Sequence, residues 1–264
     1  MSLAQKADRH DLYQQSVQDP EAEMDFVEIT FRELRGRPAR DLREDFCGTA
    51  YSSCEWVARH PEHSAVAVDL DEEVLEWGED NNLSNLDDHA RDRITLLRED
   101  VRRRRRERFD CVLAMNFSYY LFEDRDSMRE YFVSVRRSLR GDGLFFLDAY
   151  GGYDAHRDIV EEREVDGFTY IWEQANFDPI SHRMDCYIHF SFPDGSRQDK
   201  AFVYPWRLWT LPEIRELLRE AGFKRTRIYW EGLDESTGEG NGEFTLSETG
   251  SADAGWICYI VAEP

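Results

Sequence analysis

The residues best suited to chemistry follow short apolar runs in a regular order. Gly48 lies in the turn of the segment LREDFCGTA, and Asp69 ends the next run, 69 − 48 = 21 residues later. Asp100 follows the third run and Asn116-Phe117 the fourth. Glycine lets a backbone approach a ligand, and an acid about 20 residues later accepts hydrogen bonds from ribose hydroxyls. Each residue alone is as readily a turn glycine or a helix cap, but their shared order predicts a cofactor containing adenosine, with Asp100 accepting from the adenine amine.

The elements that must position these residues alternate between strand and helix. The helical stretches lie at 51–59, 71–81 and 125–140, and the apolar runs at 65–69, 94–97, 109–115 and 144–147. Such short apolar runs are typical of strands buried on both faces. Alternation of this kind predicts right-handed crossovers and a parallel sheet, in which ligands bind at the carboxyl ends of the strands.

The pattern changes after Tyr150. Three runs with strand character, joined by turns at Asp178-Pro179 and Pro193-Asp194-Gly195, predict an antiparallel lid at 168–173, 184–192 and 200–206. A capping box at Thr210 opens a helix that ends at Gly222, and two final strands are expected at 223–230 and 256–261. No strand is predicted in the Gly/Ser/Glu-rich stretch between them, 232–255, which is either mobile or functional.

Four segments follow from this pattern. At the N-terminus, Asp19-Pro20 opens a helix that ends at Gly36. We expect an N-terminal helical segment (1–38), a Rossmann-like core (39–150), the antiparallel lid (151–209), and a last helix with two strands of the core sheet (210–264).

Composition narrows the class of partner. The 264 residues carry a net charge of −22, which repels phosphate backbones and acidic membranes, so we expect neither nucleic acid nor membrane as a partner. The arginine run 102–106 is interpreted as a solvated stretch paired with nearby acids. Five scattered cysteines and the absence of a long apolar run indicate a cytoplasmic protein. A monomer or homodimer is expected, and the sequence does not decide between them. His182 and His189, expected on opposite faces of one strand, are interpreted as structural, and no metal is predicted.

Several motifs together resemble a known family. The segments EDFCGTA, VDLDEEVL, REDV, FDCVLAMNF, LRGDGLFFLDAYGG and WTLPEIRELLREAGF are similar to class I S-adenosylmethionine-dependent methyltransferases, and most closely to a bacterial group with the same FCGT turn. The resemblance extends from about Tyr13 to the final strand. It implies a Rossmann-like seven-stranded sheet that ends in an antiparallel strand, with S-adenosyl-L-methionine as cofactor.

The resemblance also implies a role for each cofactor residue. By this likeness Glu44, Cys47, Gly48 and Thr49 line the methionine end, Asp69 and Leu70 the ribose, Asp100 and Val101 the adenine, and Asn116 and Phe117 the sulfonium, while Tyr13 closes over the cofactor. The chain departs from the family at Phe46 and Ala50, where glycines are common; Phe46 is still expected beside the cofactor.

Two rival classes remain at this point. A nicotinamide-dependent oxidoreductase shares part of the fold, but its G-x-G-x-x-G turn is missing here. A non-catalytic relative would keep the fold as a binding or scaffold protein.

For a methyltransferase, the expected reaction is in-line displacement at the methyl carbon, with the enzyme positioning the acceptor and excluding water. A lid over the cleft favours a small-molecule acceptor. The polar groups expected to reach it are Asp148, Tyr150, Tyr204 and Arg207, of which Asp148 or a tyrosine would act as base or orienter. Arg207 would hold a carboxylate, or it would pair with an acid beside the helix at Thr210.

Overall fold

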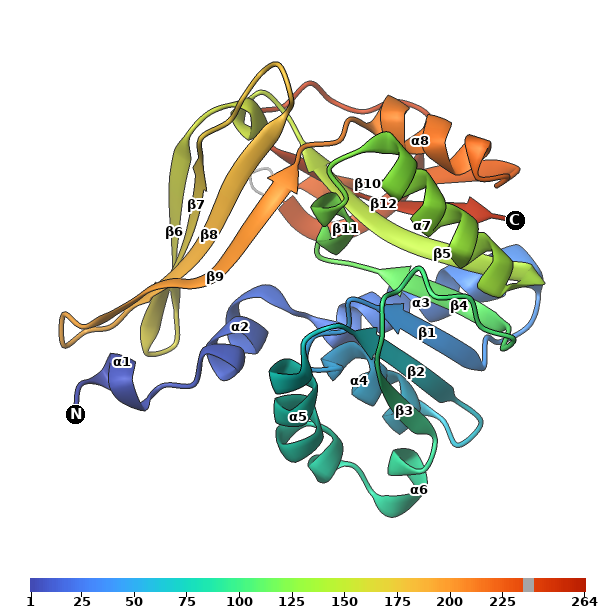
Figure 1. Cartoon of the computed structure of the whole chain (residues 1–264), viewed down its shortest axis with the longest axis horizontal. Coiled ribbons are helices and arrows are strands. Elements are labelled where there is room, and N and C mark those ends of the chain that lie inside the picture. Colours follow the sequence, from blue (N-terminus) through green and yellow to red (C-terminus); the bar gives the residue numbers. More distant parts are fainter. Residues whose placement is uncertain (235–239) are drawn as a thin grey trace.

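The chain builds two sheets, one in the core and one in a lid (Figure 1). The computed structural model describes residues 1–234 and 240–264. The core sheet has eight strands in the order β11 (Gly240–Ser247), β10 (Arg225–Leu233), β12 (Trp256–Glu263), β5 (Leu139–Gly151), β4 (Phe109–Ala114), β1 (Asp41–Asp45), β2 (Ser64–Asp69) and β3 (Ile94–Arg98). The five strands from β5 to β3 are parallel to one another. Beyond β5, the strands β12, β10 and β11 each pair antiparallel with the strand before them in this sheet.

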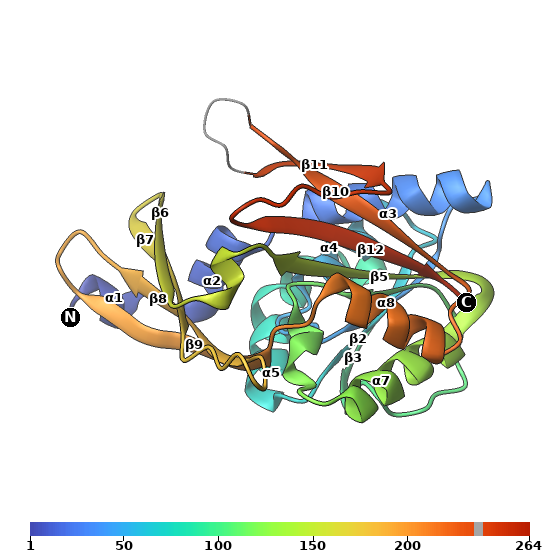
Figure 2. The same ribbon diagram turned by 90° about the horizontal axis from the view of Figure 1, so that it is seen from above.

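Helices cover both faces of this sheet (Figure 2). Their apolar sides pack in two clusters, with α3, α4 and α5 on one face and α7 and α8 on the other. The bounds are α3 (Pro20–Arg35), α4 (Tyr51–Arg59), α5 (Glu72–Asn81), α7 (Arg125–Ser138) and α8 (Leu211–Glu220). Shorter elements are α1 (Leu3–Lys6), α2 (Arg9–Val17), α6 (Asp88–Arg91), η1 (Leu83–Asn85), η2 (Ser118–Leu121) and η3 (Asp154–His156).

The helix ends predicted from capping residues are confirmed. Asp19 caps α3 through the amide of Ala22, and Gly36 ends the helix in the left-handed conformation. Thr210 and Glu213 form the expected capping box of α8. The helix expected at 125–140 ends earlier, at Ser138, because the backbone from residue 139 onward pairs with β4.

The predicted count of seven strands is wrong, because β11 lies within the stretch 232–255 where no strand was expected. It pairs antiparallel with β10, and Phe244 stacks on Tyr259 with ring centroids 3.8 Å apart. Residues 235–239 of that stretch lie outside the described part of the chain.

The lid is a four-stranded antiparallel sheet of β6 (Ile159–Val165), β7 (Phe168–Ala175), β8 (Arg183–Ser191) and β9 (Arg197–Arg207). The sequence predicted three of these strands and missed β6, an exposed and highly charged edge strand. His182 was expected on the same strand as His189, but it lies in the turn just before β8.

The strand order reverses between β1 and β4. β2 and β3 follow β1 on one side, whereas the chain crosses over to place β4 and β5 on the other. Loops after the two strands at such a switch point diverge and leave a crevice for ligands. The segment 46–50 follows β1 and the pair Asn116-Phe117 follows β4, so both lie at this crevice.

Candidate functional site

The turn after β1 takes a left-handed course at alternate residues. Phe46, Gly48 and Ala50 have φ angles of 58°, 53° and 56°. Phe46 and Ala50 stand where glycines are common, yet they adopt a conformation that costs an ordinary residue about 1–3 kcal/mol. A strained backbone at the switch point is typical of ligand-binding turns, and here it occurs without the additional glycines.

Asp69 connects the end of β2 to this turn. One carboxylate oxygen accepts from the Gly48 amide at 2.8 Å and the other from the Asp71 amide at 3.0 Å. The side chain stays partly exposed, while the next residue, Leu70, is 65% exposed. The structure therefore brings Asp69 against Gly48 in the turn after β1.

Asp100, at the end of β3, shares its carboxylate with an arginine. Arg102 donates to both oxygens, the shortest contact being 2.6 Å, and these bonds hold the pKa of Asp100 below its usual range. An adenine amine would have to share the carboxylate with Arg102. Val101 beside it is buried. Arg103 and Arg105 both pair with Glu99, so three of the five arginines in the run 102–106 are paired with nearby acids.

Two buried carboxylates hold the first turn of α4. Glu44 on β1 accepts from the amide and hydroxyl of Ser53, and Glu23 on α3 accepts from the hydroxyl of Ser52 at 2.9 Å. Neither forms an ion pair with an arginine or lysine of the described chain. Burial raises the pKa of Glu44 to about 8 and that of Glu23 to about 7. A positively charged group placed beside them would stabilise both carboxylates.

Glu23 was not among the site residues expected from the sequence. Val27 and Thr30 follow Glu23 by four and seven residues, which places all three on the buried face of α3. This helical spacing could have identified Glu23 as a buried acid.

Asp148 fixes the loop after β4. Its two oxygens accept from the backbone amides of Asn116 at 2.7 Å and Phe117 at 2.9 Å. Both of these residues are left-handed, with φ of 58° and 54°. Asp148 is 5% exposed, and burial raises its pKa to about 7. Its hydrogen bonds make Asp148 an anchor for the residues that the resemblance assigns to the sulfonium.

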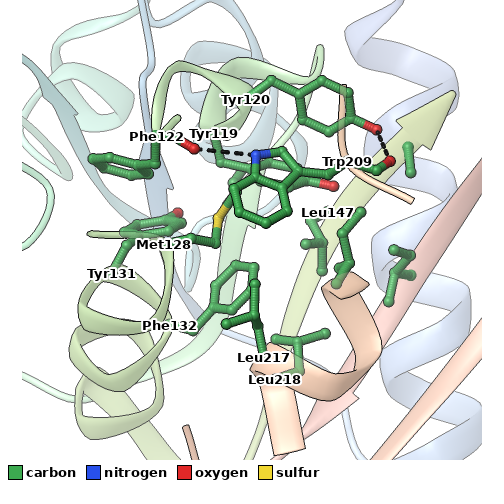
Figure 3. Close-up of a cluster of buried hydrophobic side chains, with 14 of the residues drawn as sticks. Tyr119, Tyr120, Phe122, Met128, Tyr131, Phe132, Leu147, Trp209, Leu217 and Leu218 are labelled. Carbon is green, nitrogen blue, oxygen red and sulfur yellow. Dashed lines mark hydrogen bonds between the residues drawn. The ribbon is translucent and has the colours of Figure 1, made fainter. Parts of the chain in front are cut away.

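An aromatic cluster supports the same loop from below (Figure 3). The indole nitrogen of Trp209 donates to the carbonyl of Phe122 at 3.1 Å, and the hydroxyl of Tyr120 contacts the carbonyl of Trp209 at 3.5 Å. Met128 and Phe132 of α7 and Leu217 and Leu218 of α8 pack around them. These contacts anchor the segment that follows Asn116 and Phe117 in the buried core.

A cavity of about 840 Å³ lies between the lid and this edge of the sheet. Asn116, Phe117, Tyr150 and Tyr204 are among the residues that line it. Its walls are strongly aromatic and include four of the seven tryptophans of the chain, Trp172, Trp206, Trp230 and Trp256. Asp148 is not part of the lining, since its carboxylate faces the loop backbone.

The structure does not bring Arg207 to the cavity. Its guanidinium pairs with Glu213 at 2.8 Å and lies over the ring of Trp209 at 3.8 Å from the centroid. This arrangement matches the alternative in which Arg207 pairs with an acid beside the capped helix.

The N-terminal segment reaches both the turn and the cavity. On α2, the Gln14 amide donates to the Thr49 hydroxyl at 2.8 Å. The preceding residue, Tyr13, lines the cavity, and its ring lies 4.9 Å from that of Phe202 in the lid, measured between centroids. One turn of helix therefore contacts both the proposed cofactor turn and the lid.

Within residues 1–234 and 240–264, no group of three His, Cys, Asp or Glu side chains is arranged to hold a metal ion. His189 instead contacts Glu173 and Asp199 within the lid. No helix in the described part is both long and apolar enough to cross a membrane.

Comparison with known proteins shows similarity to methyltransferases in both sequence and fold. The methyltransferase domain family matches residues 45–147. A search of curated proteins gave no match. Three solved structures are similar over almost the whole chain. One is an S-adenosylmethionine-dependent methyltransferase from Clostridium acetobutylicum ATCC 824, with 18% identity over 96% of each chain and a TM-score of 0.69. Another is the amino pentose methyltransferase CalS10 from Micromonospora echinaspora with S-adenosylmethionine bound, with 15% identity over 97% of this chain and 96% of that chain and a TM-score of 0.65. The third is the sugar N-methyltransferase KedS8 from Streptoalloteichus sp ATCC 53650, with 17% identity over 100% of this chain and 94% of that chain and a TM-score of 0.63.

These likenesses at low identity concern the fold, and the family match concerns residues 45–147. Both agree with the family that the sequence motifs indicated. Residues 45–147 match the methyltransferase domain family, and the chain as a whole has the fold of class I S-adenosylmethionine-dependent methyltransferases.

Proposed function

We propose that this protein transfers a methyl group from S-adenosylmethionine to a small-molecule acceptor held in the cavity beneath the lid. The observation that carries this proposal is the position of the cavity. Asn116 and Phe117, which line it, follow β4 at the point where the strand order of a methyltransferase fold reverses.

The residues at the switch point fit a cofactor that carries both a ribose and positive charge. The Gly48 turn and Asp69 would hold the ribose, and the buried carboxylates of Glu44 and Glu23 suit an ammonium or sulfonium group because no basic side chain neutralises them. When bound, the cofactor supplies an electrophilic methyl carbon attached to sulfonium.

The protein's own contribution is placement and the exclusion of water. Asp148 holds Asn116 and Phe117 in position, and the aromatic walls keep the cavity apolar beside them. Tyr150 and Tyr204 are the candidate polar groups for orienting the acceptor. Asp148 would affect the reaction only by positioning this loop, and Arg207, which pairs with Glu213 outside the cavity, would not contact the acceptor.

The size of the cavity supports a small acceptor. At about 840 Å³ it falls in the range of small-molecule sites, and lid residues such as Trp172 and Tyr204 are among those that line it. Methyl-labelled S-adenosylmethionine, incubated with the protein and separately with small-molecule, protein and nucleic-acid fractions of a bacterial extract, tests this directly. We expect label in the small-molecule fraction, reduced by Tyr204→Phe. Label only in a macromolecular fraction would contradict the proposal.

A further inference from the structure

The charged groups on the cavity wall are nearly all acidic. Glu161 and Glu162 of β6, Glu231 of β10 and Asp253 line it, and none of the four forms an ion pair within the described chain. Glu231 is anchored by the amide of Gly242 at 3.1 Å, and its partial burial raises the pKa of its carboxyl group. The wall therefore offers carboxylates that lack a positive partner.

The one cationic side chain on the described lining is already engaged. Arg163 donates to the carbonyl of Ser16, and its guanidinium lies 5.5 Å from the ring centroid of Tyr170. An acceptor with a carboxylate or phosphate would meet several like charges and no free cation. The cavity therefore disfavours anionic acceptors.

The aromatic walls favour the opposite charge. Trp206 lies 4.8 Å from Tyr204 and 6.0 Å from Trp172, and Trp230 lies 4.9 Å from Trp256, measured between ring centroids. The faces of such rings attract ammonium groups, most strongly where water is excluded. Aromatic rings together with unpaired carboxylates are the surroundings that a protonated amine prefers.

The described lining offers weak bases to a hydroxyl acceptor. No histidine, lysine or cysteine lies in it, so its bases are carboxylates and tyrosines. Asp148, which is buried behind the loop after β4, already accepts two backbone amides. A hydroxyl group must lose its proton during attack and is poorly served by a carboxylate, whereas a neutral amine attacks with its own lone pair.

We infer that the acceptor is a basic amine, drawn into the cavity as a cation by Glu231 and Asp253 and methylated on nitrogen. This inference rests on the proposed function. The ammonium form first loses one proton to water or to a carboxylate at the mouth. The nitrogen lone pair then forms the new bond to the methyl carbon, while that carbon's bond to sulfur breaks and its electron pair remains on sulfur. The methylated product is again an ammonium ion.

Three near-isosteric probes test the inference without knowledge of the natural acceptor. 2-Phenylethylamine, 2-phenylethanol and phenylacetate are titrated into the protein saturated with S-adenosylhomocysteine, following tryptophan fluorescence. We expect the amine to bind at least about tenfold more tightly than the alcohol or the acid. Equal or tighter binding of the alcohol or the acid, or no binding of any probe, overturns the inference.

Variants localise the effect. Glu231→Gln and Asp253→Asn should each weaken amine binding about threefold or more and leave the alcohol unchanged. The matched control is Asp126→Asn on α7, where the aspartate is exposed and is not among the lining residues. Unchanged amine binding in both variants also overturns the inference. Binding of S-adenosylhomocysteine is measured first. If it fails, the proposed function fails; if it succeeds without a preference for the amine, only the acceptor assignment fails.

Discussion

Replacing Asp148 with asparagine should separate positioning of the loop from binding of the cofactor. The carboxylate accepts the amides of both Asn116 and Phe117, and it is almost completely buried. An asparagine has one acceptor oxygen, so its NH₂ group would face the second backbone N–H, leaving that donor unpaired.

The expected cost follows from this loss. One buried unpaired donor costs about 1–3 kcal/mol, and for a chain of this size each kcal/mol lowers the melting temperature by roughly 2–4 °C. We therefore expect Asp148→Asn to melt about 2–12 °C lower. The left-handed residues would also relax away from the crevice, so kcat should fall about tenfold to a hundredfold. The affinity for S-adenosylmethionine should fall less than kcat does, because the Gly48 turn and Asp69 would still hold the ribose while only the residues proposed to flank the sulfonium move.

The assays are thermal denaturation, cofactor calorimetry and production of S-adenosylhomocysteine. Asp126→Asn is the control, because that side chain is 89% exposed and pairs only with Arg129. Full activity in Asp148→Asn with a lowered melting temperature would refute the positioning role. An unchanged melting temperature would refute the hydrogen-bond argument itself.

Three further predictions follow from the same contacts. Asp69→Ala should weaken S-adenosylmethionine binding at least about tenfold, because charge-assisted bonds contribute about 1.5–3 kcal/mol each; an unchanged calorimetric Kd would place the ribose elsewhere. Because burial raises the pKa of Glu44 from 4.5 to about 8, the folded state holds its proton more tightly, and stability should fall as pH rises through this window. Denaturant titrations across this pH window should show that the free energy of unfolding falls less in Glu44→Gln than in the unchanged protein. An equal fall in both would contradict the raised pKa of Glu44. Arg207→Ala should lose its contacts with Glu213 and Trp209 and melt a few degrees lower with methyl transfer intact; a selective loss of activity would return Arg207 to the site.

Elements with local signals were predictable from the sequence. The caps of α3 and α8 depend on residues within one helical turn of each helix end, so Asp19-Pro20 and the box at Thr210 sufficed. The strands β6 and β11 were missed because most of their residues are exposed, and because the sequence of β6 consists mainly of charged residues. Edge strands of this kind are set by pairing with a neighbour rather than by their own apolar pattern.

The candidate site was predictable as an order of residues, but its bonding was not. Parallel strands end at one edge, so Gly48, Asp69 and Asn116 were expected to meet there. The pairing of Arg207 with Glu213 and of Asp148 with two backbone amides depends on side-chain directions in the folded chain. Glu23 contributes from a helix outside the cofactor motifs, so no motif pointed to it.

Calorimetry with the cofactor tests the central claim most directly. We predict that S-adenosylmethionine and S-adenosylhomocysteine each bind once per chain, and that NAD does not bind. Tight binding of NAD without a response to either sulfur compound would contradict the account.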